Sequence, residues 1–244
     1  VGVFSRCVDI GATGNYIKSY RARGRDILAS PFYFADNLDS LVDLTAKVGA
    51  DDIGSILDLV KRNQGWPLSM LKHNSEIGGY SLSPEQGQLL LHLCGEGVLK
   101  PPSISFKSGK ESFVFTPAPG AKKLDASNRE IYERAMALVS CVRKGQLLAE
   151  RYRIRNPVAL LSALKDRGYL RANSEAALQY GNLVFLKVGV LRRARGDFWE
   201  FHLVRNSENE KALDAALTLL NTGELSGLEV NEDARIALEK DERY

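Results

Sequence analysis

The sequence is poor in the residues that build metal sites and disulfide frameworks. Its 244 residues include three cysteines and three histidines, and no Cys-x-x-Cys pair occurs. The cysteines are far apart and odd in number, which argues against a disulfide framework and against a cysteine zinc site. No segment approaches the roughly 18 consecutive apolar residues that a membrane span needs. We therefore expect a chain with no metal, no cofactor and no membrane association, in a reducing, cytoplasmic compartment.

Sequence signatures of catalysis are also missing. Neither a Gly-x-Ser-x-Gly nor a Walker pattern is present, and the histidines form no His-x-x-x-His pair. Gly11-Ala-Thr-Gly14 lacks the Gly-Lys-Ser/Thr of a phosphate loop and the third glycine of a dinucleotide loop, so it predicts a turn. We expect a protein that is not an enzyme. The first residue is valine and no signal-peptide pattern follows, so we also expect a piece of a longer protein.

The overall charge of +3 conceals an uneven distribution along the chain. Residues 129–205 contain 15 basic and 7 acidic residues, residues 206–244 contain 4 and 10, and residues 1–128 contain 14 and 13. The apolar fraction of 44% and the charged fraction of 26% are typical of globular proteins and exclude a disordered or coiled-coil chain. A basic block followed by an acidic tail indicates a charged partner and says little about fold.

Turn and capping signals divide the chain into segments. Val1–Ile10 predicts a strand that turns at Gly11–Gly14 and returns over Tyr16–Tyr20, as the end of an interrupted preceding unit would. Asp36 or Asn37, Asp51, Leu68 and Ser83-Pro84 then begin four helices, and residues 104–115 form a hairpin. A linker follows at 117–123. The predicted domains are 1–35, a strand and turn segment; 36–120; 121–206; and 207–244, a helix with an acidic tail.

The segment after the linker repeats the pattern of the one before it. Ser127 or Asn128 begins a helix that ends by Gly145, Gln146–Tyr152 is a short second helix, and Asn156-Pro157 begins a third that ends at Gly168. Strands are predicted at 169–170 and 183–186, and 188–193 and 198–204 form a hairpin around the turn 194–197. A last helix runs from Ser207 to about Asn221. It serves either as a dimerisation or inter-domain surface or as a helix docked on its own domain.

The two units align directly. Placing Gly97 on Gly168 pairs Leu89-Leu90 with Leu160-Leu161 and Leu93 with Leu164, and a hairpin follows in each unit. Low identity with a shared order of elements indicates a tandem repeat.

The order helix, short helix, turn, helix, strand, hairpin resembles the winged helix-turn-helix superfamily. Residues 146–170, QLLAERYRIRNPVALLSALKDRGYL, resemble its helix-turn-helix core, and their ending is similar to the common end of its third helix. The resemblance covers residues 129–204 well and 51–116 less well. It implies an α+β, mainly α fold of tandem winged-helix domains, preceded by a partial third unit.

In that superfamily the third helix enters the major groove of DNA, and the hairpin, or wing, reaches phosphates or the adjacent minor groove. Arginines at a hairpin tip are also explained as an edge that resists strand pairing. The helix from Pro157 offers few groups that read bases. The residues predicted to contact DNA are Arg143, Lys144, Arg151, Arg153, Arg155, Asn156, Ser162, Lys165, Arg167, Arg192, Arg193 and Arg195.

Two hypotheses follow. The first is a protein that binds double-stranded DNA, as a transcriptional regulator or as the DNA-recognition part of a larger assembly, acting as a homodimer or in a larger complex. The second is a tandem winged-helix interaction subunit of a chromosome-associated or defence complex. The second is favoured by the apolar third helices, by the acidic tail, and by the absence of Lys and Arg from the helix that begins at Pro84.

Overall fold

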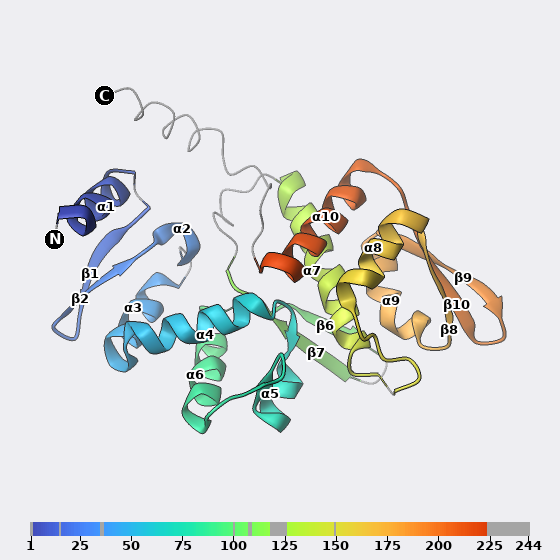
Figure 1. The fold of residues 1–244 in the computed structure, drawn as a ribbon, viewed down its shortest axis with the longest axis horizontal. Helices are drawn as coiled ribbons and strands as arrows, with labels where there is room; N and C mark the ends of the chain where they lie inside the picture. Colours follow the sequence, from blue (N-terminus) through green and yellow to red (C-terminus); the bar gives the residue numbers. More distant parts are fainter. Residues whose placement is uncertain are drawn as a thin grey trace.

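The computed structural model describes residues 2–14, 16–34, 37–99, 101–106, 109–117, 126–148 and 150–223. In these residues the fold is α+β and mainly helical, with small antiparallel sheets. The elements are arranged along an elongated body, with α1 at one end and the β9–β10 hairpin at the other (Figure 1). Residues 118–123 of the predicted linker and the acidic tail from residue 224 lie outside the described residues.

The N-terminal segment differs from the prediction. Residues predicted as a strand form helix α1 (Gly2–Thr13), and the hairpin lies later, between β1 (Lys18–Ala22) and β2 (Arg25–Ala29). Val3, Cys7 and Ile10 recur at helical spacing. The β-branched residues of the segment had instead indicated a strand. The turn falls at Arg23-Gly24, where both residues have positive φ. This is the backbone that a two-residue hairpin turn of type I′ requires.

The first core lies between helices and two short sheets. Its elements are α2 (Pro31–Phe34), α3 (Leu38–Val48), α4 (Ala50–Arg62), β3 (Trp66–Pro67), α5 (Leu68–Asn74), β4 (Glu76–Ile77), β5 (Tyr80–Ser81), α6 (Pro84–Gly95), β6 (Ser103–Phe106) and β7 (Gly109–Val114). Ile56, Val60, Leu90 and Leu93 are buried together at the centre. The predicted start of α6 is confirmed, because the Ser83 hydroxyl accepts from the Gln86 N–H in a capping box.

The second core follows the chain from α7 (Ala126–Gly145) to α10 (Ser207–Thr222). Between them lie α8 (Pro157–Arg167), β8 (Tyr169–Asn173), α9 (Ala176–Phe185), β9 (Gly189–Arg195) and β10 (Phe198–Leu203). The three strands form a sheet in the order β8-β10-β9. The predicted hairpin around residues 194–197 is confirmed, and so is the Asn156 cap of α8, whose side chain accepts from the Ala159 N–H at 2.9 Å.

Two predicted elements of this unit are wrong. Residues 146–148 and 150–152 form turns instead of a short helix. The chain turns sharply at Gly145, whose α-carbon faces Ile154 and Gln179 so closely that a side chain would collide with both. Residues 183–186, predicted as a strand, end helix α9, because Ala176, Tyr180 and Leu183 are buried at helical spacing. The helix-turn-helix core predicted at residues 146–170 therefore lacks its first helix, and only turns are described between α7 and α8.

The two cores meet along β7 and the loop after α4. Phe113 and Phe115 pack into the second core, while Val114 between them packs into the first, since successive side chains of a strand point to opposite faces. The Gln64 side chain donates to the backbone oxygen of Gly223 at 2.8 Å and accepts from the Thr116 N–H at 3.1 Å. These contacts fasten the end of α10 to the first unit.

Helix α10 docks on its own unit. Ala212, Leu213, Ala216 and Leu219 recur at intervals of one, three and three residues, form one buried stripe, and belong to the same core as α7. Figure 1 shows α10 beside α7 and α8. The structure therefore shows α10 docked on its own domain, with its C-terminal end also in contact with the first unit.

Candidate nucleic-acid interface

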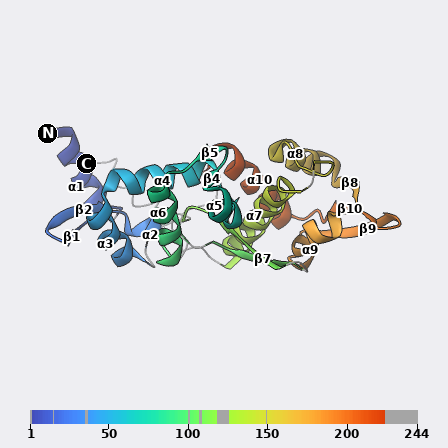
Figure 2. The same ribbon diagram turned by 90° about the horizontal axis from the view of Figure 1, so that it is seen from below.

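The β9–β10 hairpin extends beyond the body at one end of the long axis (Figure 2). Arg192, Arg193 and Arg195 are exposed along β9 up to its turn. Within the described part of the chain, none of these three arginines has an ion pair. Arg192 lies opposite Glu200 in the register, but the Glu200 carboxylate contacts the His202 ring nitrogen at 2.9 Å instead. The hairpin therefore presents cations to which no carboxylate of the described residues is paired.

Aromatic rings hold two of these arginines in place. The Arg193 guanidinium lies 5.9 Å from the centre of the Trp199 ring, and its Nε donates to the Gly196 oxygen at 2.6 Å. The Arg195 guanidinium lies 5.6 Å from the centre of the Phe198 ring. Cation–π contacts orient a guanidinium while leaving its N–H donors available at the ring edge. The sequence pattern predicted no such role for Phe198 and Trp199.

The inner face of the hairpin joins it to the core. Phe201 and Leu203 are buried and Trp199 is partly buried, as the alternation of residues along β10 predicts. Gly189 lies directly against the Phe201 ring and the His202 backbone, where no side chain would fit. The base of the hairpin is thus packed into the core, and its projecting tip is polar and basic.

A second basic cluster lies in the segment between α7 and α8. Arg151, Arg153 and Arg155 are exposed there. Arg153 and Arg155 both approach Glu150, at 3.4 and 2.8 Å, and the Arg151 guanidinium lies 5.4 Å from the Tyr152 ring centre. One carboxylate shared by two guanidiniums leaves a positive excess in this loop.

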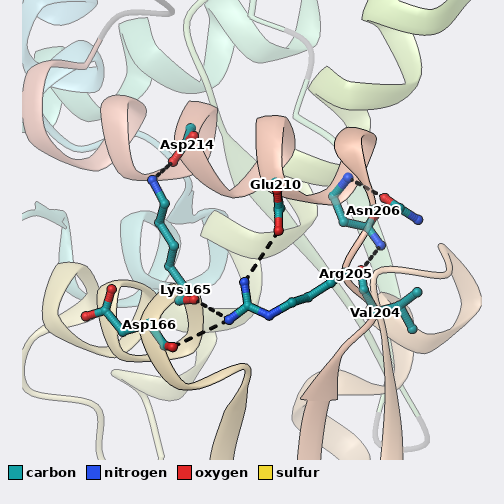
Figure 3. A network of polar contacts seen from close by, with 8 residues as sticks. Lys165, Asp166, Val204, Arg205, Asn206, Glu210 and Asp214 are labelled. Atoms are coloured by element: carbon teal, nitrogen blue, oxygen red, sulfur yellow. Dashed lines mark hydrogen bonds and ion pairs between the residues drawn. The ribbon is translucent and has the colours of Figure 1, made fainter.

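Helix α8 exposes few of the side chains that its predicted role in DNA contact requires. Lys165 reaches α10, where its Nζ is 2.5 Å from the Asp214 carboxylate, and this hydrogen bond raises the pKa of Lys165 (Figure 3). Arg205 donates to the Lys165 backbone oxygen at 2.8 Å near the C-terminal end of α8. Ser162 is half-buried. The exposed residues within the helix are Ala159, Lys165, Asp166 and Arg167.

Arg143 joins the two cores instead of facing solvent. Its Nε donates to the Gln64 backbone oxygen at 3.0 Å, its Nη1 donates to Gln146 at 3.0 Å, and the guanidinium lies 5.8 Å from the Trp66 ring centre. Burial lowers the pKa of Arg143 to about 10. Burial also lowers the pKa of the neighbouring Lys144.

We expect Arg143→Ala to lower the free energy of unfolding by about 2–3 kcal/mol, because it removes charge-assisted hydrogen bonds between the cores. Urea denaturation measures this, with Lys47→Ala, on the exposed side of α3, as a control expected within about 0.5 kcal/mol of the parent. A variant as stable as the parent would contradict this role of Arg143.

The residues predicted to contact DNA thus lie in several separate parts of the structure. The hairpin tip gathers Arg192, Arg193 and Arg195. The α7–α8 segment gathers Arg151, Arg153 and Arg155 and leads to the Asn156 cap, and Arg167 is exposed at the end of α8. Lys165 pairs with α10 and Arg143 lies between the cores. The sequence signals for the two exposed groups were charge and turn residues. Neither pairing had a signal, because the partners are 49 and 79 residues away.

Two of the three cysteines belong to the cores: Cys141 is buried and Cys94 packs against the first core, whereas Cys7 on α1 is exposed. Burial raises the pKa of the Cys94 thiol to about 11 and that of Cys141 to about 12, so both are unreactive at neutral pH. Among the described residues, no three His, Cys, Asp or Glu side chains cluster as metal ligands would. No helix in that same part of the chain has both the length and the apolar character to cross a bilayer.

Comparison with protein-family models, curated proteins and solved structures finds no match to the chain.

Proposed function

We propose that the protein binds double-stranded DNA through the β9–β10 hairpin, with the arginines of the α7–α8 segment as a second contact and α8 as the helix nearest the groove. The observation that carries the proposal is the set of three exposed arginines on a projecting hairpin without carboxylate partners among the described residues. Exposed guanidiniums that are not paired with a carboxylate can form bidentate contacts with phosphates. Such phosphate contacts supply much of the affinity of DNA-binding proteins.

The composition of α8 indicates what kind of binding to expect. Its outward residues include Ala159 and Asp166, and its lysine is paired with Asp214. Direct base recognition uses Arg, Lys, Asn or Gln side chains in the major groove, and α8 offers few of them. We therefore propose binding dominated by the phosphate backbone, with weak sequence preference. The protein would serve as a regulator or as the DNA-contacting part of a larger assembly.

A salt titration of duplex binding tests the proposal. For the wild type, log K should fall linearly with log salt, by about 0.9 for each phosphate contacted. Changing Arg192, Arg193 and Arg195 to alanine should flatten that slope by up to about 2.7. A triple variant at Lys47, Lys72 and Lys110, which are exposed on the other unit, makes the same charge change and should leave the slope near that of the wild type.

Two results would overturn the proposal: absence of salt-dependent duplex binding, or an equal loss in both triple variants. The second would show that net charge alone accounts for binding.

Protein binding is the second candidate function, and one observation favours it. Helix α9 exposes Leu178 and Phe185, which are seven residues apart and so lie on one side of the helix, and the Phe185 side chain is 82% exposed. Large apolar side chains exposed together mark interaction surfaces. This role would belong to an interaction subunit of a chromosome-associated or defence complex. It becomes the preferred function if the wild type shows no salt-dependent duplex binding.

A further inference from the structure

The hairpin at the opposite end of the molecule is more basic than β9–β10. Residues 18–29 contain four cations, Lys18, Arg21, Arg23 and Arg25, and one acid, Asp26, whereas residues 189–203 contain three cations and two acids. The predicted DNA-contacting residues include none from this segment. Its charge is therefore unexplained by the function proposed above.

One of these cations fixes the hairpin and the others remain available. The Arg23 guanidinium forms two hydrogen bonds with the Asp43 carboxylate of α3, at 2.7 and 2.8 Å. This pair raises the pKa of Arg23 and lowers the pKa of Asp43. Lys18, Arg21 and Arg25 are exposed, and in the described residues no carboxylate pairs with them. Asp26 lies opposite Arg21 in the register without forming an ion pair with it.

The two hairpin tips share a tetrapeptide. Arg21-Ala-Arg-Gly24 at one end matches Arg193-Ala-Arg-Gly196 at the other, and both glycines have positive φ. The turn occupies Arg23-Gly24 in the first hairpin and Gly196-Asp197 in the second, so the tetrapeptide is shifted by one residue. Each tip nevertheless combines exposed arginines with a tight turn. This arrangement lets backbone and side chains approach a phosphate backbone closely.

The two hairpins lie at opposite ends of the longest axis, with both cores between them, in two perpendicular views (Figures 1 and 2). A nucleic-acid segment held at one tip is therefore separated from the other tip by the whole body. We infer that the β1–β2 hairpin is a second duplex-binding site and that one chain holds two duplex segments, one at each end. This inference rests on the proposed function for the chemistry of the first site.

Stoichiometry with short duplexes tests the inference. Duplexes of about 12 base pairs, about 40 Å long at 3.4 Å per base pair, are used to keep each bound duplex short. Sedimentation at low salt should show two duplexes per wild-type chain. The Arg21→Ala/Arg25→Ala variant should bind one, and so should the variant with alanine at Arg192, Arg193 and Arg195. A Lys72→Ala/Lys110→Ala control, at two exposed lysines away from both hairpins, should still bind two.

A sandwich assay gives an independent measurement. An immobilised duplex should retain a labelled second duplex only when wild-type protein is present, and either hairpin variant should abolish that retention. One duplex per chain that depends only on Arg192, Arg193 and Arg195 would overturn the two-site inference and leave the proposed function intact. Loss of all duplex binding in the wild type would overturn both.

Helix α1, next to this hairpin, suggests a competing partner for the β1–β2 hairpin. Val3, Phe4 and Ile10 of α1 are exposed, and an apolar helix face beside a basic hairpin also suits an anionic lipid surface. Vesicles of phosphatidylcholine with phosphatidylserine are the probe. If Arg21→Ala/Arg25→Ala reduces vesicle binding while the duplex stoichiometry remains unchanged, the second duplex site is disproved.

Discussion

Asn209→Ala is expected to lower the free energy of unfolding by about 3–5 kcal/mol, because it leaves a buried arginine without its partner. The Asn209 side chain is completely buried. Its Oδ1 accepts from Arg134 Nη1 at 2.8 Å, and its Nδ2 donates to the backbone oxygens of Val204 at 2.8 Å and Lys187 at 3.0 Å. Alanine supplies none of these groups.

The effect should be large because Arg134 has little alternative. Its side chain is buried in α7, its Nε has no hydrogen-bond partner among the described residues, and its other contact is the Glu130 carboxylate one turn earlier. A buried cation that loses a partner retains its full desolvation cost. Asn221→Ala, an exposed asparagine near the end of the same helix, is the control and should change stability by less than about 0.5 kcal/mol.

Urea denaturation followed by circular dichroism measures both variants. The contacts of Asn209 also predict where the structure loosens first, because Lys187 precedes β9 and Val204 follows β10. Asn209 therefore ties together the two ends of the hairpin. Hydrogen exchange in Asn209→Ala should accelerate in β9 and β10 more than in α4 and α6. Equal stabilities of Asn209→Ala and Asn221→Ala would contradict this assignment.

The elements that were predictable carry local signals. The Asn156 cap of α8 and the Ser83 capping box of α6 satisfy helix N–H groups through neighbours three residues away, so a short stretch of sequence contains the whole interaction. The β9–β10 hairpin was predictable because apolar and polar residues alternate around a glycine turn. Local chemistry determined these elements.

The elements that were predicted wrongly either depend on tertiary packing or were assigned the wrong periodicity. Residues 146–152 have the composition of a helix, but Ile154 closes over Gly145 and forces a turn. Helix α1 contains Val3, Phe4 and Ile10, which favour strands in isolation, but Val3, Cys7 and Ile10 recur at helical spacing. Composition alone does not distinguish these alternatives.

The sequence predicted the positive charge of the candidate site but not which partners its charged side chains contact. Clusters of arginine near turns mark exposed cations, and the structure exposes those of the hairpin and of the α7–α8 segment. Lys165 and Arg143 have the same charge in the sequence, yet Asp214 holds one and Gln64 the other. Such partners are set by the packing of α10 and of the two cores, which no local pattern encodes.

Phe201→Ala is expected to cost about 3–5 kcal/mol of unfolding free energy, because it removes a fully buried aromatic ring from the sheet that carries the hairpin. The Phe201 ring lies 5.2 Å from that of Tyr180 on α9 and faces Gly189 on β9. It therefore joins the helix and both strands of the hairpin. Gly189, which faces the ring, has no side chain to move into the resulting cavity.

Phe198→Ala is the matched control for Phe201→Ala, since it removes the same side chain from the same strand at a partly buried position under Arg195. Its expected cost is about 1 kcal/mol or less. Thermal and urea denaturation should therefore separate the two variants by at least about 2 kcal/mol. Since Phe198 orients Arg195, its loss should weaken duplex binding in a folded protein, whereas Phe201→Ala should weaken binding only in proportion to the unfolded fraction. If Phe201→Ala were as stable as Phe198→Ala, the hairpin would not depend on the core beneath it, and its arginines would be a mobile charged loop instead of a positioned site.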